Sequence, residues 1–320
     1  MRGNPPQPAN TIYPGAKVTM PGIILPPGIR VIQSYRHSGY VPMRGLALLA
    51  SAGLLALLLA GRVAMAAGPE PVEFRDGDLA IKGFLYRPDG PGPFPAVVAM
   101  HNCGGLVNAS GTIATRYRDW ALQLVKAGFV VLFPDSYGSR GLGNQCAVRN
   151  QPVRTDRERV ADATAARRWL QTQPEVKADR ISLLGWSNGA TGVLWAVRPR
   201  PGHEERSDFR SAVVFYPGCR RLENTAWSAR VPTLILVGAL DDWTSVQECE
   251  RMVAGARGRS ARASIIVYPG AFHDFDHPSR PPQIRAGSAF SADGSGRFHS
   301  GTNATARADA LKRVPQWLAR

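Results

Sequence analysis

The first 66 residues contain no aspartate and no glutamate, although the chain of 320 residues has 24 of them. This stretch holds six of the 39 lysines and arginines. The rest of the chain therefore has 33 basic against 24 acidic side chains, and the net charge falls from +15 to +9. These basic residues are scattered over the expected helices and loops, which is typical of a solvated basic surface. Zinc-finger, RNA-recognition and helix–turn–helix signatures are also missing. We therefore expect no nucleic-acid partner.

Within this acid-free stretch, residues 43–66 have the pattern of a secretory signal peptide. The pattern begins with a short basic region at Met43, continues with an apolar stretch, and ends with the small-x-small sequence Ala64-Met65-Ala66. Cleavage there would start the mature chain at Ala67. No cysteine follows directly, so we expect no stable membrane anchor after cleavage and a periplasmic or secreted protein. An uncleaved signal that anchors the protein in the membrane is the alternative.

Residues 1–42 are rich in proline and glycine and have no convincing periodicity. A signal peptide lies at the start of a chain. We therefore interpret residues 1–42 as a non-native or disordered extension upstream of a true start at Met43, with a start at Met1 as the alternative. Residues 67–320 have the length of one α/β domain of about 250 residues.

The chain has only four cysteines, and no pair of them has metal-site spacing, so we expect no structural metal. An even number in an exported protein allows two disulfides in three pairings. Cys219 ends one expected strand, and Cys249 lies on the helix after the next strand. We favour the pairs Cys219–Cys249 and Cys103–Cys146. Four separate buried thiols are the alternative.

Short apolar runs alternate with helical patterns along residues 67–320. The first two runs predict an antiparallel pair around the turn Asp76-Gly77-Asp78. The alternation indicates a mostly parallel central sheet with helices on both faces in a single domain. The glycine- and serine-rich stretch 278–300 is expected to be a long surface loop. We expect strands at 72–74, 79–86, 95–100, 129–133, 181–184, 212–216, 233–237 and 264–268, and helices at 117–127, 155–173, 246–256 and 304–318.

The motif Gly185-Trp186-Ser187-Asn188-Gly189 lies between the strand at 181–184 and a helical pattern that begins at Ala190. Gly-x-Ser-x-Gly between a strand and a helix is the nucleophile elbow of α/β-hydrolases. The turn is so tight that only glycine leaves space on either side of the serine. We therefore expect Ser187 to be a nucleophile.

A serine nucleophile needs a histidine to take its proton and a carboxylate to orient that histidine. In α/β-hydrolases these residues follow in the order serine, acid, histidine. Asp241 comes just after the strand at 233–237, and His273 comes just after the strand at 264–268. We assign them as acid and base. The neighbouring Asp242 is expected to cap the next helix, and exchange of the two aspartate roles is the alternative.

The oxyanion hole needs two backbone N–H groups. We expect one from Asn188, which follows the nucleophile, and the other from Cys103 in the loop after the strand at 95–100, with Asn102 as the alternative. Candidate substrate contacts in or beside these motifs are Arg140, His101 and Trp186. Arg140 has two interpretations, because it could grip an acidic substrate or brace its own loop.

Together these motifs resemble the dienelactone hydrolase family of α/β-hydrolases. The chain differs from the family archetype at two positions: Ser187 replaces a cysteine nucleophile, and His277 replaces an arginine four residues after the histidine. The resemblance implies hydrolysis of esters or lactones without a metal or organic cofactor. The matching segments, spread over residues 72–320, are 101–105, 133–141, 185–189, 238–241 and 268–275.

The sequence therefore predicts an exported serine hydrolase that cleaves small-molecule carboxylic esters or lactones through an acyl-enzyme. A peptidase or polyester depolymerase that uses the same three residues is one alternative. A non-catalytic envelope binding protein is another, although an intact Ser187, Asp241 and His273 set argues against it. The sequence carries no signal of oligomeric state.

Overall fold

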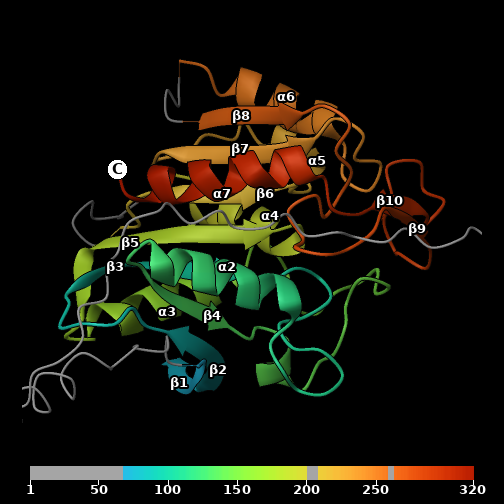
Figure 1. Ribbon diagram of the computed structural model, residues 1–320. Coiled ribbons are helices and arrows are strands. Elements are labelled where there is room, and N and C mark those ends of the chain that lie inside the picture. The colour runs from blue at the N-terminus through green and yellow to red at the C-terminus, as the bar shows by residue number, and fades with distance from the viewer. Residues whose placement is uncertain (1–67, 200–207, 259–262) are drawn as a thin grey trace, which may run out of the picture. The chain divides into compact units, whose positions relative to one another are not determined.

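The computed structural model describes residues 68–199, 208–258 and 263–320 (Figure 1). The expected extension at 1–42, the signal peptide at 43–66 and the predicted mature start at Ala67 lie outside these residues. The described residues form a single domain with a mostly parallel central sheet and helices on both faces, as the sequence predicted.

The centre of the domain is an eight-stranded sheet with the order β1-β2-β4-β3-β5-β6-β7-β8. The hairpin of β1 and β2 is antiparallel, and β2 is also antiparallel to β4. All other neighbours are parallel. The central strands read as continuous apolar runs because helices cover both of their faces. The strands are β1 Glu70–Asp76, β2 Leu79–Tyr86, β3 Phe94–Met100, β4 Val130–Pro134, β5 Val176–Trp186, β6 Ala212–Phe215, β7 Thr233–Gly238 and β8 Ala263–Tyr268.

Helices cover the sheet on both faces, each with its own buried apolar cluster. Helices α2 (Thr115–Lys126) and α7 (Ala304–Leu318) pack on the face that is nearer in Figure 1. Helices α3 (Glu158–Gln171), α4 (Asn188–Ala196) and α6 (Val246–Gly255) pack on the other face, and the short α5 spans Arg220–Glu223. No helix of the described residues is both long and apolar enough to cross a membrane.

The expected loop at 278–300 contains a small hairpin, which corrects the sequence interpretation. Strands β9 (Gln283–Arg285) and β10 (Phe298–Ser300) pair antiparallel to each other. Each has only three residues, which is too short for a period-two pattern to stand out in a glycine- and serine-rich stretch. The hairpin is attached near the carboxyl end of β8 through a parallel bridge between His273 and Ser300.

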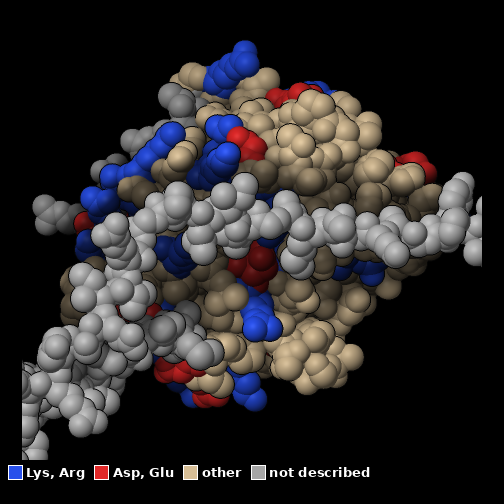
Figure 2. All heavy atoms as spheres, in the orientation of Figure 1, with Lys and Arg blue, Asp and Glu red and all other residues tan. Residues whose placement is uncertain are grey.

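Both favoured cysteine pairs, Cys103–Cys146 and Cys219–Cys249, are disulfide-bonded. On the face that Figure 2 shows, lysines and arginines are dispersed, with aspartates and glutamates among them, as the sequence predicted.

Candidate active site

Ser187 lies in the sharp turn between β5 and α4. Its backbone has φ 51° and ψ −115°, a region that costs energy for any residue with a side chain. A side chain at Gly189 would collide with the carbonyl oxygens of Met100 and His101, and one at Gly185 would come within 2.9 Å of the backbone of Ala190. The two glycines therefore allow the turn that holds the serine at the carboxyl end of the sheet.

Asp241 and His273 meet at the ends of β7 and β8. The His273 Nδ1 atom lies 2.7 Å from Asp241 Oδ2. The other carboxylate oxygen accepts the backbone N–H groups of Trp243 and Thr244, each at 2.9 Å. Since Nδ1 donates to a fixed carboxylate, the lone pair is on Nε2. The Nε2 atom is buried and has no hydrogen-bond partner among the described residues, so it can accept a proton.

The strand β6 connects the serine to the histidine. The Ser187 N–H donates to the Phe215 carbonyl at 2.9 Å, and the next residue, Tyr216, packs its ring 4.2 Å from the His273 ring. Thr244 lines the same pocket as Ser187 and donates to Asp241 Oδ2 at 3.0 Å. All three predicted residues thus lie at one edge of the sheet.

Asp242 has a different role from the one expected. Its carboxylate binds His299 on β10, with 2.7 Å to the ring Nδ1 and 2.7 Å to the backbone N–H. Helix α6 begins instead with Ser245, whose hydroxyl accepts the Glu248 N–H. The prediction of a helix cap at Asp242 was therefore wrong, and the structure pairs His273 with Asp241 and not with Asp242.

Ser187 opens into a pocket of about 140 Å³. The Asn102 N–H already donates to the Tyr117 hydroxyl at 2.9 Å, whereas no described residue accepts the Cys103 N–H. Asn188 is the first residue of α4, where a backbone N–H has no partner within the helix. The pocket is lined by Cys103, Cys146, Gln151, Ser187, Asn188, Thr191, Gly218, Trp243, Thr244 and Phe290.

The structure places the three candidate substrate contacts away from this pocket. Arg140 makes two hydrogen bonds to Asp162, at 2.7 and 3.0 Å, and therefore braces its own loop. His101 is fully buried, and its Nε2 accepts the Ser136 N–H at 3.2 Å. Burial, with a contribution from Arg159, holds the pKa of His101 well below its usual value, so the ring is neutral.

Trp186, the third candidate, belongs to a buried cluster around Asp276. The carboxylate of Asp276 accepts the indole N–H groups of Trp120 at 2.7 Å and Trp186 at 2.8 Å, and the Tyr216 hydroxyl at 2.5 Å. Sequence reasoning missed this cluster. The available signal was the need of buried tryptophan and tyrosine tips for a polar partner, and Asp276 lies three residues after His273.

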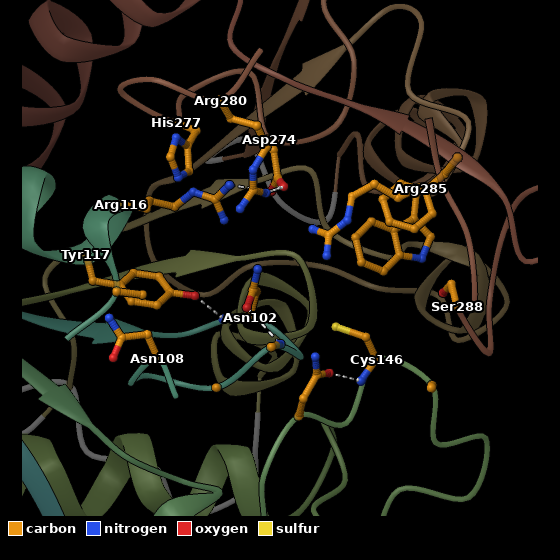
Figure 3. Close-up of a pocket in the computed structure, with 18 of the residues that line it drawn as sticks. Asn102, Asn108, Arg116, Tyr117, Cys146, Asp274, His277, Arg280, Arg285 and Ser288 are labelled. Carbon is orange, nitrogen blue, oxygen red and sulfur yellow. Dashed lines mark hydrogen bonds and ion pairs between the residues drawn. The ribbon is translucent and has the colours of Figure 1, made fainter. Parts of the chain in front are cut away.

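A second, larger cavity of about 500 Å³ adjoins the Ser187 pocket, and Cys146 and Trp243 line both. Figure 3 shows Arg116 and Arg280 beside Asp274, with Arg285 on another side of the cavity. Both Arg116 and Arg280 form ion pairs with Asp274. Burial, followed by these arginines, lowers the pKa of the nearby His277 to about 4. Nothing in the sequence pattern indicated this cavity.

Comparison with known proteins agrees with this geometry. The model of the dienelactone hydrolase family matches residues 81–320. The chain belongs to the dienelactone hydrolase family. It is therefore a hydrolase that acts on ester bonds. Among the described residues, no group of three or more histidine, cysteine, aspartate or glutamate side chains is arranged to hold a metal ion.

The chain has low sequence identity to individual relatives and solved structures. A probable 2-oxo-3-(5-oxofuran-2-ylidene)propanoate lactonase from Bradyrhizobium is 29% identical over 204 residues, which are 60% of this chain and 77% of the relative. A dienelactone hydrolase-like promiscuous phosphotriesterase from metagenomic libraries has a TM-score of 0.60 at 20% identity, covering 80% of this chain and 98% of the other. A putative dienelactone hydrolase from Klebsiella pneumoniae has a TM-score of 0.57 at 19% identity, covering 79% and 100%. At these identities the solved structures show a shared fold.

Proposed function

We propose that the protein is an exported serine hydrolase that cleaves small carboxylic esters or lactones through an acyl-enzyme. The observation that carries this proposal is the buried bond between His273 Nδ1 and Asp241 Oδ2, which leaves Nε2 without a partner at the same sheet edge as the strained Ser187. Membership of the family supports the reaction class.

In the proposed reaction, Ser187 Oγ attacks the substrate carbonyl while His273 Nε2 takes the hydroxyl proton. Asp241 fixes the tautomer of the ring and stabilises its protonated form. The N–H groups of Cys103 and Asn188 bind the oxyanion of the tetrahedral intermediate. His273 then returns the proton to the leaving alcohol. A water molecule, deprotonated by His273, attacks the acyl-enzyme and releases the acid, and His273 returns this proton to Ser187 Oγ.

The proposed substrate size follows from the pocket. A volume of about 140 Å³ beside Ser187 suits a short acyl group better than a polymer chain. This favours small esters and lactones over the alternative of a polyester depolymerase, which needs a broad groove.

Replacement of the nucleophile tests the proposal. We expect Ser187→Ala to lower kcat for p-nitrophenyl butyrate on the order of 10⁶-fold if chemistry is limiting. A fluorophosphonate probe should label the protein and not this variant. The exposed Ser110→Ala is the matched control, because its side chain bonds only within its own loop. Unchanged turnover in Ser187→Ala would contradict the proposal, and a folded protein without activity or labelling would favour the binding-protein alternative.

Export is supported by the two disulfides, because such bonds persist in oxidising compartments. We expect the protein expressed in bacteria from Met43 to appear in the periplasm or medium with Ala67 as its first residue. N-terminal sequencing of the fractionated protein measures this. A cytoplasmic protein that retains residues 43–66 would contradict export, and a membrane-bound one would support an uncleaved anchor.

A further inference from the structure

The segment 145–151 connects the two loops that carry the proposed oxyanion donors. Asn188 Nδ2 donates to Gln151 Oε1 at 2.9 Å, and Gln151 Nε2 donates to the Gln145 carbonyl at 2.9 Å. The Gln145 N–H then donates to the Cys103 carbonyl at 2.8 Å. An unbroken path of hydrogen bonds therefore runs from the residue of one donor to the residue of the other.

The Cys103–Cys146 disulfide adds a covalent bond to this path, because Cys146 follows Gln145 directly. The Cys146 carbonyl also accepts the N–H of Ala289, next to Phe290 in the pocket wall. Figure 3 shows the sulfur of Cys146 at the edge of the larger cavity, which this residue lines. The bond thus forms part of the wall between the two cavities.

On the side that follows Cys103, the restraints are local to the oxyanion loop. The Gly104 N–H donates to Asn102 Oδ1 at 2.8 Å and the Gly105 N–H donates to the Asn102 carbonyl at 3.3 Å, and neither bond reaches the segment 145–151. On the other side, the Tyr117 hydroxyl holds the Asn102 N–H. A donor must be fixed before the reaction to stabilise charge that develops in the transition state. The disulfide supplies a restraint at the donor residue itself.

We propose that the Cys103–Cys146 disulfide positions the Cys103 N–H in the oxyanion hole, and that Gln151 couples this position to Asn188. The proposal rests on the proposed function of Ser187. Cys146 and Gln151 are positioning residues, since they act through the donors. Cleavage of the disulfide therefore lowers kcat and leaves substrate binding nearly unchanged.

Dithiothreitol provides the reducing step. One of its thiolates attacks the Cys146 sulfur, and the Cys103 sulfur leaves as a thiolate and takes up a proton. The second sulfur of dithiothreitol then closes a ring disulfide and releases the Cys146 thiol. Two electrons pass from dithiothreitol to the protein. The larger cavity gives the reagent access to Cys146.

Two double variants of the mature protein test the proposal. C103S/C146S keeps both backbone N–H groups and lacks only the bond between the side chains. C219S/C249S is the matched control, because neither cysteine lines either cavity and Cys103–Cys146 is its one remaining disulfide. Steady-state hydrolysis of p-nitrophenyl butyrate gives kcat and KM after dithiothreitol has been removed anaerobically, and circular dichroism checks the fold.

We expect kcat of C103S/C146S to fall about 10- to 100-fold, with KM within about twofold of the wild type. Removal of an oxyanion donor lowers kcat about 10²–10³-fold, and a donor that is only displaced should lower it less. Oxidised C219S/C249S should have the kcat of the wild type, lose it to the same extent after reduction, and regain it with oxidised glutathione. A C103S/C146S kcat within about twofold of the wild type, or a raised KM alone, would overturn the proposal.

The Gln151→Ala variant tests the proposal with both disulfides intact, because it removes only the side chain that bonds to Asn188 and to the Gln145 carbonyl. We expect its kcat to fall about tenfold, whereas Gln173→Ala, whose amide bonds only to residues 169 and 172, should not change it. An unchanged kcat in Gln151→Ala would overturn the coupling to Asn188. The Ser187→Ala variant tests the proposed function separately. If it loses activity while C103S/C146S and Gln151→Ala keep theirs, this inference fails and the proposed function stands.

Discussion

At the scale of single residues, two adjacent aspartates have separate partners. Asp241 is buried and binds His273, while Asp242 is half-exposed and binds His299. Both His–Asp distances are 2.7 Å, so distance alone does not distinguish the pairs. Burial does, because a carboxylate removed from water stabilises a protonated imidazole more strongly.

This difference predicts opposite outcomes for the two amide variants. We expect Asp241→Asn to lower kcat about 10³–10⁴-fold, because an amide at this place favours the wrong tautomer of His273. Asp242→Asn is the matched control and should keep kcat within about tenfold of the wild type. Ester hydrolysis at pH 7 measures both. A larger loss in Asp242→Asn than in Asp241→Asn would show that the roles are exchanged.

The position of Ser187, Asp241 and His273 at one edge of the sheet could be predicted, because each follows a readable apolar strand and parallel strands end at the same edge. It could not locate the partners of Arg116 or Asp276, since Trp120 lies 156 residues from Asp276 in the chain. The partners of the candidate substrate contacts Arg140 and His101 could not be located for the same reason, and for Arg140 they support the interpretation that it braces its own loop. Their buried partners come from α3 and from the loop after β4, and no local pattern reveals such contacts.

At the scale of elements, the hairpin of β9 and β10 shapes the site without belonging to the sheet. The Asp242 carbonyl accepts the N–H of Ala292 within the hairpin, and the carboxylate of Asp242 binds β10. Two residues before Ala292, Phe290 lines the Ser187 pocket although 48% of its surface is exposed. The connection between the two strands therefore forms one wall of the Ser187 pocket.

Truncation of this wall should change the preferred acyl length. We expect wild-type kcat/KM to be highest for acetate to butyrate esters, and Phe290→Ala to shift the optimum toward hexanoate or longer chains. A p-nitrophenyl ester series measures this. Ile284→Ala, also exposed on the hairpin but in neither cavity wall, is the matched control. The same optimum in Phe290→Ala and the wild type would contradict a role of Phe290 in substrate size.

The larger elements could be predicted, and the hairpin could not. The helix expected at 304–318 has these bounds in the structure, because an apolar stripe at helical spacing follows the N-cap Asn303. The strand expected at 181–184 extends from 176 to 186. Its first half contains charged residues, so the apolar pattern did not indicate that part of the strand. Strand β10 binds Asp242 in the loop after β7, 57 residues earlier in the chain, so the residues of the hairpin alone do not specify it.

At the scale of the whole molecule, a buried ion cluster joins α2 to the segment after β8. Asp274 lies between Arg116 and Arg280. Burial alone would raise the pKa of Asp274, but Arg116, His273 and Arg280 outweigh this effect and hold the pKa well below its usual range. The ionised carboxylate therefore stabilises the fold.

This depressed pKa predicts the acid sensitivity of the domain. The stabilisation is fully present above the unfolded-state pKa of about 3.9 and is lost as the pH falls through the folded-state pKa. We expect Asp274→Asn to lower the free energy of unfolding by about 3–5 kcal/mol at pH 7, and by less at pH 3. Urea unfolding at both pH values measures this.

The exposed Asp89→Asn is the control for this prediction and should change the free energy of unfolding by less than about 0.5 kcal/mol. An equal effect of Asp274→Asn at pH 7 and pH 3 would show that the cluster does not depend on the charge of Asp274.

The two disulfides have a consequence for the order of oxidation. Each joins cysteines that are consecutive in the chain, so the two closed loops neither overlap nor enclose each other. A chain that emerges N-terminus first presents Cys103 and Cys146 before Cys219 is available. Oxidation of the cysteines in the order of emergence would therefore form both native pairs.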